Sequence, residues 1–179
     1  MFTLQPVVFL EETTSTNDVA SSLISSDKAT EGTLVLTDFQ TKGRGQRGNG
    51  WASNKGENLL MSLIFKPEWL SAKDTFLLNM CVALGVYDYV VLRADSHVGI
   101  KWPNDILADK KKIAGILIEN TFRGSSLSWS IAGIGVNLNQ TKFKEGFKHA
   151  ISLHMISRMN FVPQQEAVEL RRNIFYWYE

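Results

Sequence analysis

Residues 112–138 read KIAGILIENTFRGSSLSWSIAGIGVNL, and this stretch decides the fold class. Apolar and β-branched residues fill both halves, and the polar segment 123–126 (RGSS) separates them. Two such runs around a short Gly-containing turn predict a β-hairpin. Because successive strand residues point to opposite faces, we expect Gly133, Gly135 and Asn137 on one face of the second strand.

Three glycines interrupt this hairpin where its strands would otherwise be continuous. Gly115 lies in the first strand, and Gly133 and Gly135 lie in the second. A glycine weakens a strand unless something must approach its backbone closely. We therefore interpret this face as the floor of a ligand site. A bulge or a sheet crossing is the alternative interpretation.

The rest of the chain supplies further strands and four helices around the hairpin. Apolar and β-branched runs predict strands over residues 7–12, 33–39, 58–65 and 98–102. Helical spacing predicts a helix that follows the cap-forming run 13–17 and ends near residue 25, and further helices over 72–93, 150–158 and 163–179. The apolar face of the long helix comprises Phe76, Leu77, Met80, Ala83, Leu84 and Tyr87. This order predicts an α+β fold, a mixed but mainly antiparallel sheet covered by helices.

Composition places the chain among ordinary globular proteins. It has 179 residues, which is one domain, with 19 Lys+Arg against 18 Asp+Glu. This balance argues against a protein that coats nucleic acid. The single cysteine excludes an internal disulfide, and the three histidines lack ligand spacing, so we expect no metal site made by protein side chains. No signal peptide or membrane span is evident, and we expect a cytoplasmic setting.

A glycine-rich basic loop follows the second strand. Residues 41–56 hold five glycines, four basic residues and no acid. The loop contains G-x-G-x-x-G, but no helix opens directly after it, as a dinucleotide fingerprint requires, and kinase and P-loop signals are absent. Converging backbone N–H groups with Arg44 and Arg47 favour an anion, and Trp51 can stack on a planar ring. A solvated flexible loop with incidental arginines is the alternative.

A second polar segment follows the predicted strand 98–102. Residues 101–105 read KWPND, which places an amide and a carboxylate, Asn104 and Asp105, where the strand ends. Pro-Asn-Asp is also ordinary turn chemistry, so this segment carries little weight alone.

Taken together, six segments resemble the biotin protein ligase family. They are residues 15–17 (STN), Gln40, 43–51 (GRGQRGNGW), 101–105 (KWPND), 112–116 (KIAGI) and 133–137 (GIGVN). They keep the family's order within residues 11–139. The resemblance implies one catalytic domain over residues 1–179, with terminal helices over 150–179. It also implies a fold similar to the catalytic domains of class II aminoacyl-tRNA synthetases and lipoate ligases.

The resemblance implies a two-step reaction. Biotin and ATP with Mg²⁺ give biotinyl-5′-AMP and pyrophosphate, and a lysine of a biotin carboxyl carrier protein, from acetyl-CoA carboxylase or a related carboxylase, then displaces AMP. The biotin carboxylate must approach a triphosphate, and two unit charges repel by roughly 4 kcal/mol at about 4 Å and an effective dielectric constant of about 20. Cations at the reacting centre offset this repulsion.

The resemblance also assigns roles to individual residues. The biotin-binding set would be Ser15, Thr16, Asn17, Gln40, Gly43, Arg44, Gly115 and Gly133, with the last two leaving room along the biotin tail. The nucleotide-binding set would be Arg47, Trp51, Lys101, Asn104, Lys112 and Asn137. The catalytic set would be Lys112, Arg44, Arg47 and Asp105, where Asp105 orients or deprotonates the incoming lysine amine.

The sequence departs from the family pattern in three places. Gln46 stands where many bacterial members have a further arginine, which predicts weaker retention of the adenylate. The match begins about ten residues from the N-terminus, so we expect no helix-turn-helix domain and no DNA binding. The small C-terminal domain of the family is not expected within this sequence, and a homodimer through an edge strand is an open expectation.

Three other functions remain as alternatives. A lipoate or octanoate ligase would share the fold and a carboxylate substrate. A non-catalytic protein would bind biotin or its adenylate without releasing pyrophosphate. A nucleic-acid-binding module would use the basic loop with Trp51, but the near-neutral charge disfavours it.

Overall fold

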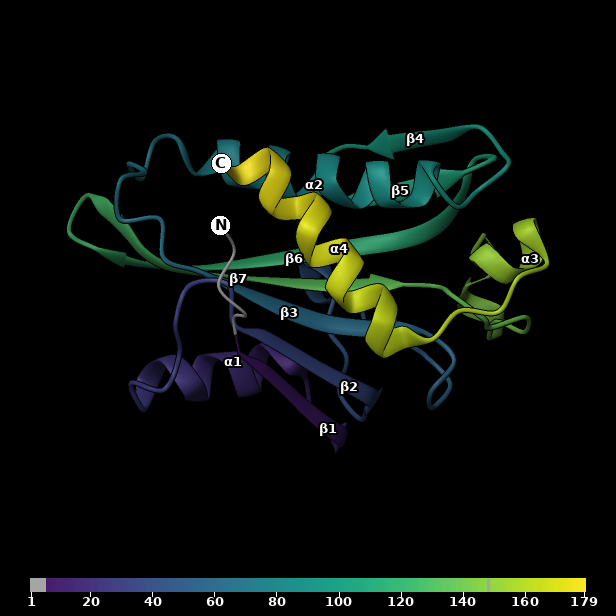
Figure 1. The fold of residues 1–179 in the computed structure, drawn as a ribbon, viewed down its shortest axis with the longest axis horizontal. Coiled ribbons are helices and arrows are strands. Elements are labelled where there is room, and N and C mark those ends of the chain that lie inside the picture. Colours follow the sequence, from purple (N-terminus) through teal and green to yellow (C-terminus); the bar gives the residue numbers. More distant parts are fainter. Residues whose placement is uncertain (1–5, 148) are drawn as a thin grey trace.

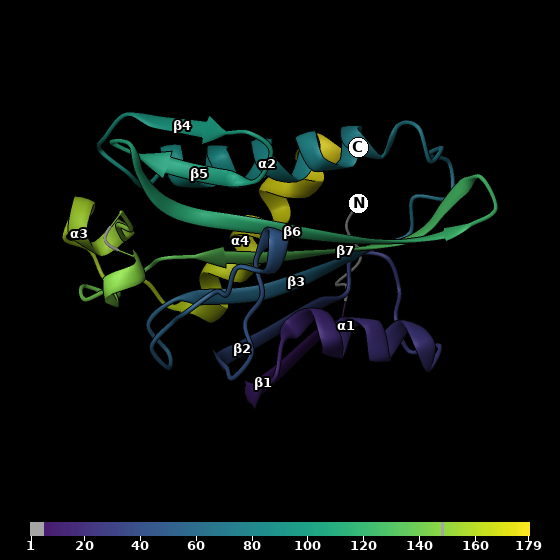
Figure 2. The same cartoon turned by 180° about the vertical axis from the view of Figure 1, so that it is seen from behind.

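The computed structural model describes residues 6–147 and 149–179, which form a seven-stranded sheet with helices on both faces (Figures 1 and 2). The strands are β1 (Val7–Thr13), β2 (Leu34–Gln40), β3 (Leu59–Phe65), β4 (Val98–Lys101), β5 (Asp105–Ala108), β6 (Lys111–Arg123) and β7 (Ser126–Val136). The α-helices are α1 (Thr16–Ser25), α2 (Thr75–Val91), α3 (Leu153–Ser157) and α4 (Pro163–Tyr178), with short 3₁₀ turns at Gln46–Gly48 and Glu145–Phe147.

The sheet has the strand order β1-β2-β3-β7-β6-β5-β4. Strands β1 and β2 run parallel, and the other neighbouring pairs run antiparallel, which confirms the mixed, mainly antiparallel sheet. The predicted hairpin is β6 and β7, with Gly115 opposite Gly135 and Leu117 opposite Gly133. The turn between them uses Gly124 at a φ of 62°, a left-handed conformation that favours glycine.

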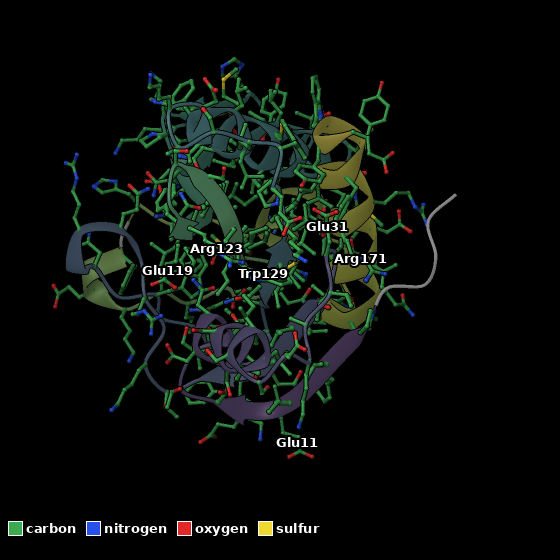
Figure 3. The ribbon with its side chains drawn as sticks, turned by 90° about the vertical axis from the view of Figure 1, so that its left-hand side faces the viewer. Glu11, Glu31, Glu119, Arg123, Trp129 and Arg171 are labelled. Carbon is green, nitrogen blue, oxygen red and sulfur yellow. The ribbon has the colours of Figure 1, made fainter. Side chains whose placement is uncertain are left out.

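Alternation along the strands divides the interior into two layers. Leu34 and Leu36 of β2 belong to the larger cluster, under α2 and α4, whereas Val35 belongs to a smaller cluster with α1. Figure 3 looks along the layers and shows α1 and α2 on opposite sides of the sheet. Burial of one alternate set by each helical layer explains why β2 and β3 read as continuous apolar runs rather than alternating ones.

The predicted inner face of the long helix is wrong at three positions. Phe76, Leu77 and Met80 are exposed. The buried positions of α2 are Leu78, Val82, Ala83, Gly85, Val86, Tyr89 and Val90, of which only Ala83 was predicted. Apolar residues surround this helix on nearly every side, so periodicity alone cannot choose the buried face. Packing against α4 and the sheet makes that choice.

One strand was not predicted. β5 (Asp105–Ala108) pairs antiparallel with β4 on one side and β6 on the other. Four residues after a proline give too short a run for a strand signal, and β5 forms because its neighbours offer backbone partners on both sides. The predicted helix over 150–158 shortens to α3, and α2 starts at Thr75 rather than residue 72.

Helices in the described part of the chain are all too short or too polar to span a lipid bilayer.

Candidate active site

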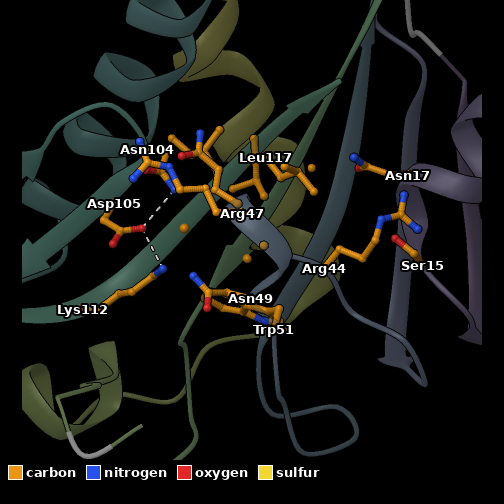
Figure 4. A pocket seen from close by; sticks show the side chains of 18 of the residues that line it. Ser15, Asn17, Arg44, Arg47, Asn49, Trp51, Asn104, Asp105, Lys112 and Leu117 are labelled. Carbon is orange, nitrogen blue, oxygen red and sulfur yellow. Dashed lines mark hydrogen bonds and ion pairs between the residues drawn. The ribbon is translucent and has the colours of Figure 1, made fainter. Parts of the chain in front are cut away.

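A cavity of about 330 Å³ opens on the face of the sheet that carries α1. The N-terminus of α1, the glycine-rich loop, the β4–β5 turn, and strands β6 and β7 form its walls and floor. Figure 4 shows Ser15 and Asn17 at one end and Asp105 with Lys112 at the other. The predicted residues that line it are Ser15, Thr16, Asn17, Gln40, Arg44, Arg47, Trp51, Lys101, Asn104, Asp105, Lys112, Gly115 and Gly133.

The end of the cavity at α1 contains an array of uncharged polar side chains, most of them buried. Thr16 donates its backbone N–H to Gln40 Oε1 at 2.8 Å, and its Oγ1 lies 3.2 Å from the same atom. Ser62 Oγ, from β3, lies 2.7 Å from Thr16 Oγ1 and 2.6 Å from Asn17 Oδ1. Ser15 is the N-cap residue of α1, but its side chain makes no capping bond to the helix, and Ser15 lines the cavity.

Because the glycines of the cavity floor have no side chains, other side chains of this protein pack directly against them. A Cβ at Gly133 would collide with Asn17 Oδ1, and one at Gly135 would collide with the ring of Trp51. A Cβ at Gly115 would lie 2.9 Å from Trp51 and 3.1 Å from Lys112 Nζ. Gly115, Gly133 and Gly135 form the floor of the cavity, and their role under a ligand stays a prediction. The room expected for a ligand tail over Gly115 and Gly133, however, holds Trp51, Lys112 and Asn17.

The glycine-rich loop folds into a short hairpin rather than an open coil. Trp51 N donates to Gly43 O at 2.9 Å, and Gly45 N donates to Asn49 O at 2.7 Å. Gly43 therefore holds the base of the loop and does not line the cavity, and its contact with the ligand stays a prediction. A Cβ there would lie 2.5 Å from Trp51 O, which requires glycine.

Arg44 forms two ion pairs at the α1 end of the cavity. Its guanidinium pairs with Asp18 at 2.6 Å and with Glu119 at 3.3 Å, and the hydrogen bond to Asp18 raises the pKa of Arg44. The two carboxylates neutralise it on the opposite side of the cavity from Lys112 (Figure 4). The structure thus does not bring Arg44 to the reacting centre that was predicted for it. Arg44 instead links the loop to α1 and β6.

The other end of the cavity is cationic. Lys112 Nζ lies 2.7 Å from Asp105 Oδ1 and 5.6 Å from the centroid of the Trp51 ring. Asn104 Nδ2 donates to Asp105 Oδ1 at 3.3 Å. Pairing of β5 with β6 puts Asp105 opposite Gly115, within reach of Lys112. Lys101 and Arg47 add two more cations to the lining, so this end suits a polyanion.

Asn137 lies in a second, smaller cavity of about 50 Å³ behind Trp51. Its side-chain amide donates to Lys112 O at 3.3 Å and to Ile151 O at 3.0 Å, so it holds the strand end that carries Lys112. The lining residues of this cavity are Gly50, Trp51, Ala52, Lys112, Asn137, Phe143, Phe147 and Ala150. Gly50, Trp51 and Lys112 line both cavities and therefore lie between them.

Sequence reasoning missed several residues of the site. Ser62 and Glu119 complete the polar end, and Phe143 with Phe147 lines the smaller cavity. Alternation from Gly115 through Leu117 puts Glu119 on the floor face, so the pattern could have indicated it. Ser62 pairs with Gly133 across β3 and β7, a register that no sequence pattern shows.

Among the described residues, no cluster of three or more His, Cys, Asp or Glu side chains could hold a metal ion. A Mg²⁺ ion keeps several waters and commonly binds through substrate phosphates with one or two carboxylates. Asp105 is the one carboxylate that lines the cavity, so the residues present fit a metal that arrives bound to a nucleotide.

Residues 9–137 match the model of the biotin/lipoate A/B protein ligase family. The chain belongs to this family. It is 38% identical over 136 residues to the bifunctional ligase/repressor BirA of Bacillus spizizenii, a match that covers 76% of this chain and 41% of that protein. The chain thus spans about half the length, or less, of curated relatives in the biotin/lipoate ligase family.

Two solved biotin protein ligases share this architecture. The enzyme from Aquifex aeolicus in complex with biotin and ATP superposes with a TM-score of 0.81 at 27% identity, over 97% of this chain and 70% of that one. The enzyme from Leishmania major in complex with biotinyl-5-AMP gives 0.79 at 30% identity, over 95% and 73%. The fold is therefore that of biotin protein ligases, as predicted.

Proposed function

We propose that this domain activates biotin with ATP to biotinyl-5′-AMP and transfers the biotinyl group to a lysine of a biotin carboxyl carrier protein. One observation supports this most strongly. A single cavity joins a buried, uncharged polar array at one end to a group of cations at the other. A ligand that fits has a neutral polar ring, a tail and a carboxylate, and the carboxylate meets a nucleotide among the cations.

The polar array favours biotin over lipoate within this family. A ureido ring carries N–H donors and a carbonyl acceptor that can bond to Ser15, Thr16 and Gln40. The dithiolane ring of lipoate makes no such bonds, so it would leave buried polar groups without partners, a large penalty for a site built for hydrogen bonds. Thr16 is only 2% exposed and Ser62 is fully buried, so water could not replace the missing hydrogen bonds.

In the first step, the biotin carboxylate attacks the α-phosphate of ATP and pyrophosphate leaves. The carboxylate is already ionised at neutral pH, so the step requires no general base. Lys112 lies between the two cavities and can bond both the carboxylate and the phosphate, while Arg47 and Lys101 offset the charge of the triphosphate. Mg²⁺ bound to ATP supplies further charge neutralisation at the phosphates.

We place the nucleotide base at the smaller cavity, which at about 50 Å³ has room for only one or two waters and must widen to take a purine. Trp51 and the phenylalanines Phe143 and Phe147 offer aromatic faces to a planar ring. Asn104, which lines the main cavity, would bond the phosphate or ribose. Asn137 acts on the nucleotide through Lys112, whose backbone it holds, rather than by direct contact of its amide nitrogen.

In the second step, the carrier lysine attacks the mixed anhydride and AMP leaves. Asp105 is the carboxylate beside this centre, and it becomes available to orient or deprotonate the amine when Lys112 turns from it to the phosphate. We expect Asp105→Asn to slow transfer from preformed adenylate by about 100-fold, the lower end of the range for general base catalysis. Unchanged transfer in a single-turnover assay would remove Asp105 from this role.

Pyrophosphate release tests the proposal. The domain is incubated with MgATP and either biotin, lipoate, octanoate or no acid. Release with biotin alone supports a biotin ligase, and release with lipoate or octanoate supports the other branch of the family. Tight biotin binding by calorimetry without release would support the binding protein instead. A salt-sensitive shift with single-stranded nucleic acid would support the nucleic-acid module.

The carrier protein, the cellular compartment and the oligomeric state are also inferred. We expect the specific carrier to be that of acetyl-CoA carboxylase or a related carboxylase, in the cytoplasm. β1 and β4 are the edge strands of the sheet, and either could pair with a second copy. Light scattering of the purified domain at several concentrations tests the homodimer.

The glycine-rich loop is expected to close over the adenylate. In the structure, the ion pair of Arg44 with Asp18 and the packing of the Trp51 ring over Gly115 and Gly135 hold the loop against the cavity. The ion pair is exposed, and exposed ion pairs are weak. We predict that amide exchange over residues 41–56 is fast in the free protein and slows at least about tenfold with biotinyl-5′-AMP, because closure excludes water from the mixed anhydride. Equal exchange in the two states would contradict this.

A further inference from the structure

Two buried amide side chains lie between the end of the glycine-rich loop and the chain that leaves β7. Asn58 is fully buried and Gln140 is 4% exposed, and together they form an amide pair. Asn58 Nδ2 donates to Gln140 Oε1 at 2.6 Å and to Ser53 Oγ at 3.0 Å. Leu138 N donates to Asn58 Oδ1 at 3.0 Å, and Asn54 N donates to Gln140 Oε1 at 3.1 Å. The amide pair therefore bonds the loop to the end of β7.

The amide pair is bonded to both of the segments that carry aromatic rings to the smaller cavity, although neither of its members lines either cavity. Its partners in the loop follow Trp51 by two and three residues. On the other segment, Gln140 Nε2 donates to Lys142 O at 2.8 Å, and Lys142 directly precedes Phe143. Residues 141–144 belong to no helix or strand, so this bond ties a segment without regular structure to the buried interior.

We propose that Gln140 is a positioning residue for the nucleotide, which holds Phe143 close to Trp51 and thereby raises the affinity for the base of ATP. The proposal rests on the proposed function, because it concerns how the same domain binds its nucleotide. The binding of biotin, whose ring belongs at the α1 end of the main cavity, should not depend on Gln140.

Backbone groups fix the orientation of both amides. The N–H of Leu138 only donates, so it requires the oxygen of Asn58, and the N–H of Asn54 likewise requires the oxygen of Gln140. Lys142 O only accepts, so it requires the NH₂ of Gln140. Donor and acceptor therefore match at every one of these contacts, and a change to one atom of Gln140 has a defined effect.

The bond from Gln140 to Lys142 affects affinity because it orders Phe143 before the nucleotide arrives. A segment that must be ordered on binding lowers the affinity by the cost of that ordering. A gap of about 1 Å between ring and base already forfeits up to about half of a van der Waals contact. Because the amide pair is buried, water cannot replace a bond that it loses.

Asn139 provides the matched control. It is adjacent to Gln140, and its side chain also bonds another segment, since its Nδ2 donates to Phe161 O at 2.8 Å and its Oδ1 accepts from Phe161 N at 2.9 Å. Neither Asn139 nor Phe161 lines a cavity. Asn139→Leu and Gln140→Met therefore each replace an amide by an apolar side chain of similar size, but only the second releases the segment that carries Phe143.

Pyrophosphate release at saturating biotin and varied MgATP tests the proposal. We expect Gln140→Met to raise the KM for ATP at least about tenfold, with the Kd for biotin, measured by calorimetry without nucleotide, within about threefold of the wild type. Gln140→Glu keeps the acceptor toward Asn54 and replaces the donor toward Lys142 by an oxygen, so it should raise this KM as well. Asn139→Leu should raise it less than about threefold.

Two further measurements separate positioning from general damage. In a Phe143→Ala background, assayed up to millimolar ATP, Gln140→Met should add less than about threefold, because no ring remains at position 143 to be held near Trp51. In the free protein, amide exchange over residues 142–147 should be faster in Gln140→Met than in Asn139→Leu, because only the first loses the bond to Lys142 O.

Three results would overturn the proposal. Equal increases of the KM for ATP in Gln140→Met and Asn139→Leu would assign the effect to the loss of any amide at this end of the sheet. An undiminished increase in the Phe143→Ala background would assign it to general disruption. A wild-type protein without biotin-dependent pyrophosphate release would overturn the proposed function as well, whereas the first two results leave that function standing. Thermal unfolding confirms that each variant is folded, and Gln140→Glu takes the place of Gln140→Met if the latter is not.

Discussion

Replacing Lys112 by alanine is expected to lower biotin-dependent pyrophosphate release by about 100- to 1,000-fold, the range found when one preorganised donor is removed from a charged transition state. Lys112 is the cation that faces both cavities, 2.7 Å from Asp105 and 5.6 Å from the Trp51 ring centroid. Biotin carboxylate and α-phosphate must meet at this boundary, so no other described cation can replace it there.

Lys111→Ala is the matched control for this prediction. Lys111 neighbours Lys112 on β6 and is exposed, and it pairs with Ala108 rather than lining either cavity. The two variants lose the same charge from adjacent positions. Full pyrophosphate release by Lys111→Ala, with similar melting temperatures for both variants, would locate the effect at the reacting centre. A loss of less than tenfold in Lys112→Ala would contradict the proposed role.

The sequence predicted the floor of the site well because strand alternation is a local rule. Gly133 and Gly135 fall on one face of their strand whatever surrounds it, and the structure puts Gly135 opposite Gly115 across β6 and β7. The motif residues at the strand ends, Asp105 and Lys112, lie 2.7 Å apart. Each of these features depends only on residues that are close in the sequence or that pair across one hairpin.

What lies over that floor could not be predicted from local rules. Trp51 covers Gly115 and Gly135, and Asn17 covers Gly133, although these side chains come from a loop and a helix far away in the sequence. The partners of Arg44 are likewise carboxylates of α1 and β6. The positive charge of the loop favoured an anion as ligand, but two acids of the protein itself neutralise Arg44.

The buried face of α2 shows a different limit. Its apolar residues surround the helix, so the choice of inner face depends on fit against α4. Gly85 lies at the crossing of the two helices, where a Cβ would be 2.5 Å from Ile174 Cα and 2.7 Å from Ile174 Cγ1. Nearby, Tyr89 donates to Glu166 at 2.7 Å, and burial raises the pKa of that tyrosine. The predicted face lacked Gly85, the residue that permits this contact.

Gly85→Val should therefore destabilise the fold by about 3 kcal/mol, because a backbone atom cannot move aside as a flexible side chain can and overpacking at such a position costs up to that amount. A loss of this size lowers the melting temperature by roughly 6–12 °C for a domain of this length. Thermal unfolding monitored by circular dichroism measures it.

Gly99→Val provides the control for this comparison. Gly99 lies in the edge strand β4 with no atom within 4 Å of a Cβ, and valine favours a strand, so its melting temperature should stay close to that of the wild type. Equal melting temperatures for the two variants would mean that α4 does not pack on α2 at Gly85. The floor of the active site lies on the opposite face of the sheet, so Gly85→Val should retain biotin binding below its lowered melting temperature. Loss of binding at a temperature where the variant is still folded would instead show that the two layers are coupled through β3 and β7.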